Sequence, residues 1–476
     1  MAETLVLVTG ANGFIASRLI PRMLAHGYHV RALARRPERL AGRSWLPSVE
    51  VCAGSTTGPE SLAAALDGVH TAFYLIHSMS SGRGYTEVEK ESAAKFARAA
   101  EAAGVQHIIY LGGLADPSDP HIAPHMRSRI ETGEVLRQGR VPVTEFRAGV
   151  ITGAGSISFE MIRFLTEFFP ILPGPTWLRN RSQPIASENV IDYLMAGLRR
   201  PDVRGGIFEM GGPERMRYSE TMLRYARFRG LSRHLFTLPW IPIWFMAIIV
   251  DRLTPVPYPI ATALVGGLQS DSQVNDETAQ KVFPEVKLIH YEQAIEAALS
   301  ELKPERLERV WEGLEGDAAN FRHEGFIIDY RRRLVNAPAQ AIFDRLVRMG
   351  GRNRWPYADW IWRLRGLADS LTSRRASRHV QPGKISKVGD EVDYYRVEAL
   401  VPGRLLRLFS TLRAPGDGWV EWRVEAQTAE TSLLMQTAFF APRGLPGFLY
   451  WFALGPMHRF VFRGTMDAIR RSSETG

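Results

Sequence analysis

The chain has 476 residues, of which 45% are hydrophobic and 23% are charged, so its composition is globular and excludes a disordered or fibrous protein. This length is too great for one ordinary domain and fits two or three. The net charge of +9 is uneven, because residues 321–476 hold 25 Lys and Arg against 15 Asp and Glu while the rest is close to neutral. The basic excess indicates a domain boundary, and it fits either an anionic partner or an Arg-rich solvated face.

Strands and helices alternate over the first 150 residues. Short apolar runs bounded by turn residues predict strands, and longer runs with helical spacing predict helices. The expected strands cover residues 4–9, 28–34, 49–53, 70–76, 105–111 and 143–147, and the expected helices cover 17–26, 59–66, 89–103 and 129–138. Regular alternation of this kind predicts an α/β fold with a doubly wound parallel sheet.

The pattern loosens after Gly153 into helices, turns and short strands. We expect residues 154–303 to form an α+β cap that completes a first domain of residues 1–303, followed by a charged linker at 304–321. The cap contains the longest apolar run, Leu235 to Val250, which is shorter than the roughly 20 residues of a membrane-spanning helix and is interrupted by prolines. A membrane span is therefore not expected, whereas a lipid-facing surface stays open.

The character of the chain changes again in residues 322–476. Strands are expected at 326–335, 391–401, 405–412, 419–426 and 432–440, with helices at 338–348 and 445–471. This order predicts a second domain of the α+β class. The first residues of the chain lack a basic region and lead straight into a strand pattern, so we expect no secretory signal and a cytoplasmic protein.

A glycine-rich loop joins the first strand to the first helix. Glycines allow the backbone to turn tightly and to approach a pyrophosphate, and the helix N-terminus offers free N–H groups to that anion. Ala16 takes the third small position of the pattern, where close helix–strand packing is needed. The loop predicts a dinucleotide site of the Rossmann type formed by Gly10, Ala11, Asn12, Gly13, Phe14 and Ile15.

The second strand is followed by Arg35 and Arg36. A site selective for NAD usually places an acidic residue there for the ribose 2′-hydroxyl. A guanidinium group suits the 2′-phosphate of NADP instead, because the contact is charge-assisted. We therefore expect NADP(H) as the cofactor; the alternative is that both arginines are ordinary surface residues.

The glycine loop, Arg35, residues 74–78 and residues 147–153 together resemble the atypical and extended short-chain dehydrogenases/reductases, a group that includes the NmrA-like proteins. The resemblance covers about residues 4–300. It implies that Leu75, Ile76 and His77 line the cofactor site and that Gly149, Val150 and Ile151 lie along the nicotinamide. Ser55 stands near the adenine, where many relatives have Asp.

The usual catalytic unit of these relatives, Tyr-x-x-x-Lys with an upstream Ser, is changed in this chain. His125 stands where Tyr is expected, Arg129 stands where Lys is expected, and the serine site reads Leu111-Gly112-Gly113. His125 is a candidate acid or base because imidazole titrates near neutrality, and Arg129 is a candidate ribose contact. The alternative is that both are surface residues at a helix start.

Residues 322–476 resemble the helix-grip class of START-like or polyketide-cyclase-like domains, and a bacterial domain of unknown function that is often fused to such Rossmann proteins. The class implies an apolar cavity for a lipid or polycyclic ligand. The many aromatic residues suit either such a cavity or an ordinary core: Trp355, Tyr357, Trp360, Trp362, Tyr394, Tyr395, Trp419, Trp422, Phe448, Tyr450, Trp451 and Phe452. Scattered histidines predict no metal site, and no nucleic-acid recognition motif is present.

Two functions follow from these patterns. The first is an NADPH-dependent oxidoreductase that reduces a hydrophobic small molecule or lipid, with the acid/base role on His125 and Arg129. The second is a non-catalytic NADP(H)-binding redox sensor or scaffold, which the altered catalytic unit favours. An arginine rim also predicts a peripheral site on an acidic membrane surface, at the inner face of the membrane, formed by Arg363, Arg365, Arg374, Arg375 and Arg378. The alternative is that residues 235–250 are simply buried in the hydrophobic core.

Overall fold

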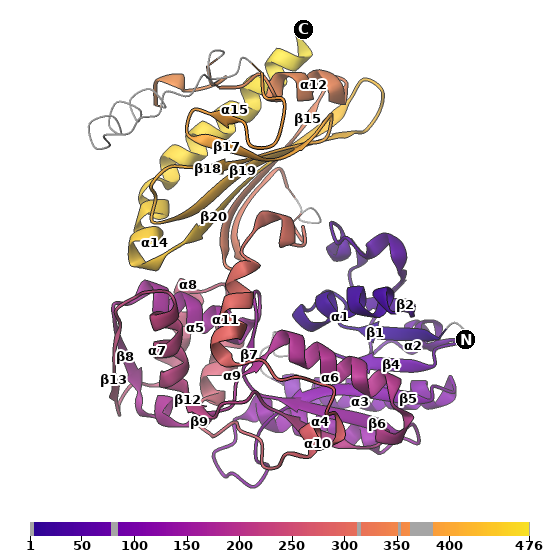
Figure 1. Cartoon of the computed structure of the whole chain (residues 1–476). Coiled ribbons are helices and arrows are strands. Elements are labelled where there is room, and N and C mark those ends of the chain that lie inside the picture. The colour runs from indigo at the N-terminus through magenta and orange to yellow at the C-terminus, as the bar shows by residue number, and fades with distance from the viewer. Residues whose placement is uncertain (1–3, 78–83, 312–315, 351–353, 362–383, 476) are drawn as a thin grey trace. The chain divides into compact units, whose positions relative to one another are not determined.

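The computed structural model describes residues 4–77, 84–311, 316–350, 354–361 and 384–475. The chain divides into two compact units, Met1–Leu314 and Glu315–Gly476, and the colours of Figure 1 run from indigo to red-orange in the first and from orange to yellow in the second. The expected arginine rim and Trp362 fall outside the described residues.

A seven-stranded parallel sheet forms the centre of the first unit (Figure 1). Its strands are β1 (Leu5–Thr9), β2 (His29–Ala34), β3 (Glu50–Ala53), β4 (Thr71–Tyr74), β5 (His107–Gly113), β6 (Val143–Ala148) and β11 (Ile207–Met210). They pair in the order β11-β6-β5-β4-β1-β2-β3, and every pair is parallel. The predicted doubly wound Rossmann fold is confirmed.

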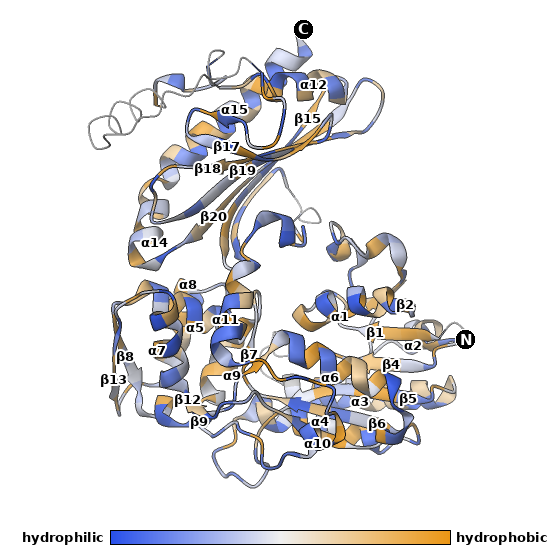
Figure 2. Cartoon of the chain, viewed as in Figure 1, coloured by the Kyte–Doolittle hydropathy of each residue, from blue (hydrophilic) through white to orange (hydrophobic). Residues whose placement is uncertain are grey.

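Both faces of this sheet are buried, as parallel sheets require. Val6 and Val8 point to one face, which α1 (Phe14–Ala25) and α6 (Ser187–Arg199) cover. Leu7 points to the other face, against residues of α2 (Pro59–Leu66), α3 (Tyr85–Ala102) and α4 (Pro124–Arg137). Figure 2 shows the result in colour: β1 is orange, while helices of this unit carry an apolar and a polar side.

The cap is a separate cluster of helices and short strands within the first unit. Its apolar core is built mainly from helices that carry one buried face each. The helices are α5 (Ile157–Phe168), α7 (Tyr218–Phe228), α8 (Ile243–Leu253), α9 (Tyr258–Gly267) and α11 (Tyr291–Ser300), and the strand pairs are β7 (Ile151–Thr152) with β10 (Ile185–Ala186), β8 (Ile171–Pro175) with β13 (His234–Leu238), and β9 (Arg181–Ser182) with β12 (Met216–Arg217). The short helix α10 (Thr278–Val282) instead packs on the main sheet.

The stretch that was expected as a linker, 304–321, carries structure at both ends. Its first part contacts the first unit, because the backbone N–H of Arg309 donates to the carbonyl of Gly42 at 3.3 Å. Its last part begins strand β14 (Ala318–His323), which pairs with β15 (Phe326–Val335) in the second unit. Residues 304–321 are therefore not a free linker, although they are rich in charge, because one end contacts the first unit and the other end belongs to the sheet of the second.

The second unit is an antiparallel sheet with helices, an α+β arrangement as predicted. The remaining strands are β16 (Glu391–Val392), β17 (Tyr395–Val401), β18 (Leu405–Ser410), β19 (Gly416–Ala426) and β20 (Ser432–Pro442). Their order is β14-β15-β20-β19-β18-β17-β16, and α12 (Ala339–Leu346) and α15 (Gly455–Glu474) pack together and on the sheet. The single helix expected at 445–471 is two helices, α14 (Gly444–Ala453) and α15, because Pro456 starts a new helix after Leu454.

Most aromatic side chains of the second unit are part of its core. Trp419, Trp422 and Phe448 are buried, whereas Trp360 and Phe452 are exposed. A cavity of about 90 Å³ lies between β19, β20 and α15, which is well below the roughly 300 Å³ of a small ligand site. Among the described residues of the whole chain, no helix is both long enough and apolar enough to cross a bilayer.

Candidate functional site

A crevice at the carboxyl ends of the parallel strands is the natural place for a ligand, because the strand order reverses between β1 and β4. The glycine loop lies at this point. Gly10 has a φ of +66°, and a Cβ atom on it would lie 2.9 Å from the carbonyl oxygen of Leu75. The loop therefore touches the end of β4, and only glycine fits there.

The loop is prepared for an anion. Gly13 is the N-cap of α1, the first turn holds no acidic residue, and the first N–H groups of a helix have no partner within it. The guanidinium of Arg43 donates to the carbonyl oxygen of Asn12 at 3.0 Å and pairs with Glu308. The indole N–H of Trp45 donates to the same carboxylate at 2.8 Å. The loop is thus held in shape from outside, and its geometry fits a pyrophosphate.

The residues expected around the adenosine half follow β2 and β3. Arg35 and Arg36 come directly after β2 and are exposed, and no hydrogen bond or ion pair to another described residue engages either side chain. Ser55 follows β3, and its hydroxyl lies 2.9 Å from the hydroxyl of Thr57. Both arginines are therefore available to an anionic group, while Ser55 takes part in a local turn.

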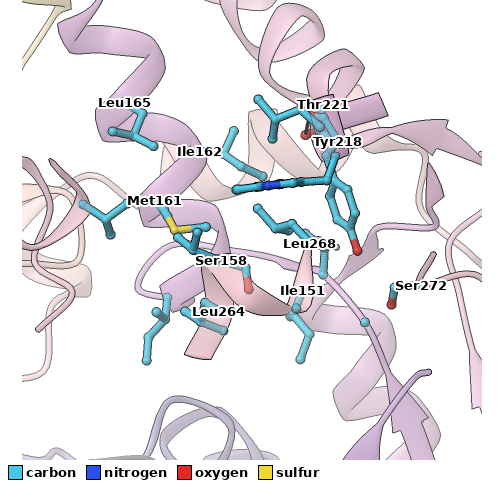
Figure 3. A pocket seen from close by; sticks show the side chains of 18 of the residues that line it. Ile151, Ser158, Met161, Ile162, Leu165, Tyr218, Thr221, Leu264, Leu268 and Ser272 are labelled. Atoms are coloured by element: carbon cyan, nitrogen blue, oxygen red, sulfur yellow. Dashed lines mark hydrogen bonds between the residues drawn. The ribbon is translucent and has the colours of Figure 1, made fainter. Parts of the chain in front are cut away.

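A cavity of about 420 Å³ opens from the same edge of the sheet into the cap. At the sheet edge the cavity is lined by Phe14 at the start of α1, Leu111 near the end of β5, and His77 and Gly149, which follow β4 and β6. The cap supplies its mostly apolar walls from α5, α7, α8, α9 and β8, among them Met161, Ile162, Leu165, Leu172, Met222, Phe245, Met246, Ile249 and Leu264. Figure 3 shows Met161, Ile162 and Leu165 side by side on α5.

Two histidines lie at the sheet end of this cavity. His125 is only 5% exposed, and burial together with the charge of Arg129 lowers its pKa to about 4. Burial, Arg129 and His125 hold the pKa of His77 well below its usual value. Both rings are therefore neutral at pH 7. His125 is not the surface residue of the alternative interpretation, and its Nδ1 has no hydrogen-bond partner among the described residues.

Arg129 is turned back onto the end of β5. Its guanidinium donates to the carbonyl oxygens of Leu111 at 3.2 Å and Gly112 at 2.9 Å. A Cβ atom at Gly113 would lie 2.8 Å from Cε of Met126 and 3.2 Å from Cδ of Arg129, so the missing side chain leaves room for both. Arg129 lines the cavity, but its donors serve the strand end; its contact with a ribose stays a prediction.

A tyrosine and a serine from the cap complete the polar end of the cavity. Tyr218 begins α7, and both its side chain and that of Ser272 line the cavity. Ser272 in turn donates to the carbonyl oxygen of Leu114 at 2.9 Å. Figure 3 shows the Tyr218 hydroxyl on the side of Ser272, away from the apolar residues of α5.

Comparison with known proteins assigns both parts of the chain. Residues 2–164 match the NmrA-like family, and residues 325–465 match a family described as a protein of unknown function, DUF2867. Because the match to the NmrA-like family spans the glycine loop and most of the parallel sheet, we refer to the first unit as the NmrA-like unit. The expected resemblance of this unit is confirmed, and so is the fusion to a domain of unknown function.

Similar proteins of the NmrA-like unit include two bacterial reductases. A (4-alkanoyl-5-oxo-2,5-dihydrofuran-3-yl)methyl phosphate reductase of Streptomyces griseus is 28% identical over 295 residues, which cover 60% of this chain and 92% of that protein. A ceramide reductase of Caulobacter vibrioides is 26% identical over 255 residues, covering 52% and 78%. The solved structure of Citrobacter sp. triphenylmethane reductase complexed with NADP(H) gives a TM-score of 0.49 at 18% identity, covering 62% of this chain and 99% of that one.

The NmrA-like unit brings eight of the seventeen predicted site residues together at one cavity. Phe14, Ile15, His77, His125, Arg129, Gly149, Val150 and Ile151 all line one cavity. Sequence reasoning missed Tyr218 and Ser272, which lie 67 or more residues after the last predicted position, Ile151, and carry no motif. A tyrosine next to an arginine at the start of a helix gives no signal of its own, and only the fold places it at the cavity.

Proposed function

We propose that the NmrA-like unit is an NADP(H)-dependent reductase of a hydrophobic carbonyl compound. The observation that carries this proposal is the cavity of about 420 Å³, which is apolar on its cap side and polar at the carboxyl ends of β4, β5 and β6. A carbonyl group at the polar end and an apolar chain along α5 and α8 would match this division.

The chain's own residues support the cofactor part of the proposal. Gly10, Gly13 and the N-terminus of α1 would hold the pyrophosphate, and Arg35 or Arg36 would pair with the 2′-phosphate that distinguishes NADP from NAD. Bound NADPH supplies a hydride equivalent. Apolar side chains around the cavity exclude water from the reacting end, which strengthens every hydrogen bond made there.

The relatives support a reductase rather than a non-catalytic protein, since both bacterial proteins described above are named reductases. Their named substrates belong to those proteins. The altered Tyr-x-x-x-Lys unit still favours the alternative of an NADP(H)-binding redox sensor or scaffold, with no turnover.

The test is NADPH oxidation by the full chain with a series of saturated aldehydes from propanal to decanal. We expect kcat/KM to rise about tenfold for every two methylene groups that enter the cavity. Ile162→Trp, which fills the cavity from α5, should abolish the preference for long chains and leave NADPH affinity unchanged. NADPH binding without oxidation by any aldehyde contradicts the reductase and supports the sensor.

A lipid-facing surface is the second part of the proposal. The segment after β13 exposes large apolar side chains, among them Trp240 (72% exposed), Trp244 (56%) and Phe245 (43%). Phe245 also lines the cavity, so the exposed patch is continuous with the site. We propose that this patch inserts into the interface of an acidic bilayer, from which an apolar substrate enters. A START-like ligand role for the second unit rests on its α+β fold and stays a prediction.

A further inference from the structure

We propose that the hydroxyl of Tyr218, positioned by Ser272, binds the carbonyl oxygen of the substrate and donates the proton that completes its reduction. This inference rests on the proposed function and deepens it. It assigns the donor role to a tyrosine of the cap, outside the sequence position where the relatives carry theirs.

The first support is the side of the cavity to which the Tyr218 hydroxyl points. Tyr218 is 5% exposed and lines the cavity, and Figure 3 shows its hydroxyl on the side of Ser272, which lines the cavity too. Ser272 uses its own proton for the carbonyl of Leu114, so its oxygen is left to accept a hydrogen bond from another group. The Ser272 backbone is held on both sides, by a bond from its N–H to Arg181 at 2.9 Å and a bond from Gln183 to its carbonyl at 2.9 Å.

The second support is the place of this pair in the site. Ser272 lies against Gly149 and Leu114, which follow β6 and β5 at the carboxyl edge of the sheet. On the other side of Tyr218 the walls are mostly apolar (Figure 3). A carbonyl oxygen that enters this end loses its water and must find a donor, since an unpaired buried acceptor costs about 1–3 kcal/mol.

The third support is the state of the competing groups. His125 is neutral at pH 7, because burial and Arg129 lower its pKa to about 4, so it carries no acidic proton to give. Burial raises the pKa of Tyr218, the nearby Ser272 side chain opposes this, and the charge of Asp271 raises it further. Tyr218 therefore keeps its proton throughout the neutral range and can lose it to the far more basic alkoxide.

The reaction balances without any further reactant. The carbonyl carbon accepts a hydride, which is one proton with two electrons, from NADPH, the reductant of the proposed function. The carbon–oxygen π bond breaks, a C–H bond forms, and the oxygen takes the proton of Tyr218. The ketone becomes a secondary alcohol, and the Tyr218 phenolate regains a proton from solvent before the next turnover.

The first experiment measures the hydrogen bond itself, without turnover. The full chain is mixed with 2-decanone labelled with ¹³C at the carbonyl carbon, and the labelled C=O stretch is recorded by infrared difference spectroscopy. We expect a band displaced to lower frequency than in hexane for the wild type and for Tyr225→Phe, which removes a tyrosine hydroxyl from α7 away from the cavity. Tyr218→Phe should lose the displaced band. An undisplaced band in the wild type, or the same band in Tyr218→Phe, overturns the inference.

The second experiment measures turnover of 2-decanone with NADPH. Tyr218→Phe should lower kcat by on the order of 100-fold with a smaller change in KM, and the wild-type rate should be flat from about pH 6 to about pH 9. Ser272→Ala keeps the tyrosine and should lower kcat by about tenfold. This variant tests the proposal even if Tyr218→Phe does not fold. A wild-type rate that falls as pH rises through the neutral range points to an imidazolium donor and overturns Tyr218.

The proposed reductase activity and the donor role of Tyr218 can be overturned independently of each other. Turnover that is unchanged in Tyr218→Phe overturns the donor and leaves the reductase in place. A displaced carbonyl band that depends on Tyr218, with no NADPH oxidation by any protein, supports oxygen binding at Tyr218 and overturns the reductase and its proton step.

Discussion

A Cβ atom at position 149 would collide with the hydroxyl oxygen of Ser272 while remaining 3.5 Å from the Cβ of that serine. Only the hydroxyl group of Ser272 would therefore clash with the added Cβ atom. Gly149 follows β6 of the sheet and Ser272 belongs to the cap, so one missing side chain lets the two parts of the site meet. The contact also keeps the Ser272 hydroxyl directed at Leu114.

This contact predicts a coupling between the two positions. Gly149→Ala should destabilise the wild type by about 1–3 kcal/mol, because the added methyl group has no room. In the Ser272→Ala background the same change should cost about 1 kcal/mol less, because the conflicting oxygen is absent. Denaturant unfolding of the four proteins measures the difference.

Gly266→Ala is the control for this cycle, since a Cβ atom there meets nothing within 4 Å and lies in helix α9. It should be neutral or slightly stabilising. An equal cost of Gly149→Ala in both backgrounds would show that the hydroxyl is not the conflicting group.

Cofactor choice depends on the arginines after β2. Arg35→Ala should weaken NADPH binding by about tenfold or more, because a charge-assisted contact with the 2′-phosphate is lost. NADH affinity should not change, since that cofactor lacks the phosphate. Arg98→Ala, an exposed arginine on α3, is the matched control. Equal affinity of the wild type for both cofactors, measured by fluorescence titration, would exclude this role.

The glycine loop depends on a residue 296 positions further along the chain, since Glu308 pairs with the Arg43 that holds Asn12. Glu308→Ala leaves the buried Arg43 guanidinium without this partner, and we expect a loss of about 3 kcal/mol in unfolding free energy. NADPH affinity should fall as well, because Asn12 loses its fixed position. Glu38→Ala, an exposed carboxylate in the same region, should change neither quantity.

The buried histidine makes stability depend on pH. The folded-state pKa of His125 is lowered to about 4 from its usual 6.5, so its contribution is fully present above about pH 6.5 and is lost as pH falls toward 4. Between about pH 7 and about pH 5 the wild type should lose about 2 kcal/mol through this group. His125→Gln should abolish the part of this pH-dependent loss of stability that is due to the buried imidazole. His121→Gln changes an exposed histidine nearby and should leave the pH dependence unchanged. Parallel pH curves for wild type and His125→Gln would refute the burial argument.

The sequence predicted the parts of the fold whose chemistry is local. β15 begins and ends at the expected residues, and the glycine loop lies between β1 and α1 as expected, because a strand, a turn and a helix N-terminus are specified by neighbouring residues. The expected start of α1 at Ser17 was late by one turn, since Phe14 and Ile15 were counted as loop although Gly13 already caps the helix.

The substrate side of the site could not be predicted in the same way. Tyr218 and Ser272 reach the sheet edge near Gly149 only because the cap folds over it, and no periodicity or spacing marks these two residues. The motif position of Arg129 suggested a ribose contact, which stays a prediction. The sequence did not show that its guanidinium satisfies the carbonyls at the end of β5, which depends on the space that Gly113 leaves.

The exposed apolar patch predicts membrane binding. The full chain should float with vesicles that contain phosphatidylglycerol, because Trp and Phe side chains are most stable at the interface between headgroups and acyl chains. Replacing Trp240 and Trp244 together by Ser should lower the bound fraction at least about fivefold, whereas Trp360→Ser, which removes an equally exposed tryptophan from the second unit, should not. Binding that persists in the double variant but is lost in Trp360→Ser would move the membrane surface to the second unit. No flotation of the wild type would exclude the membrane as the occupant of this patch, and the substrate would then have to reach the cavity from water.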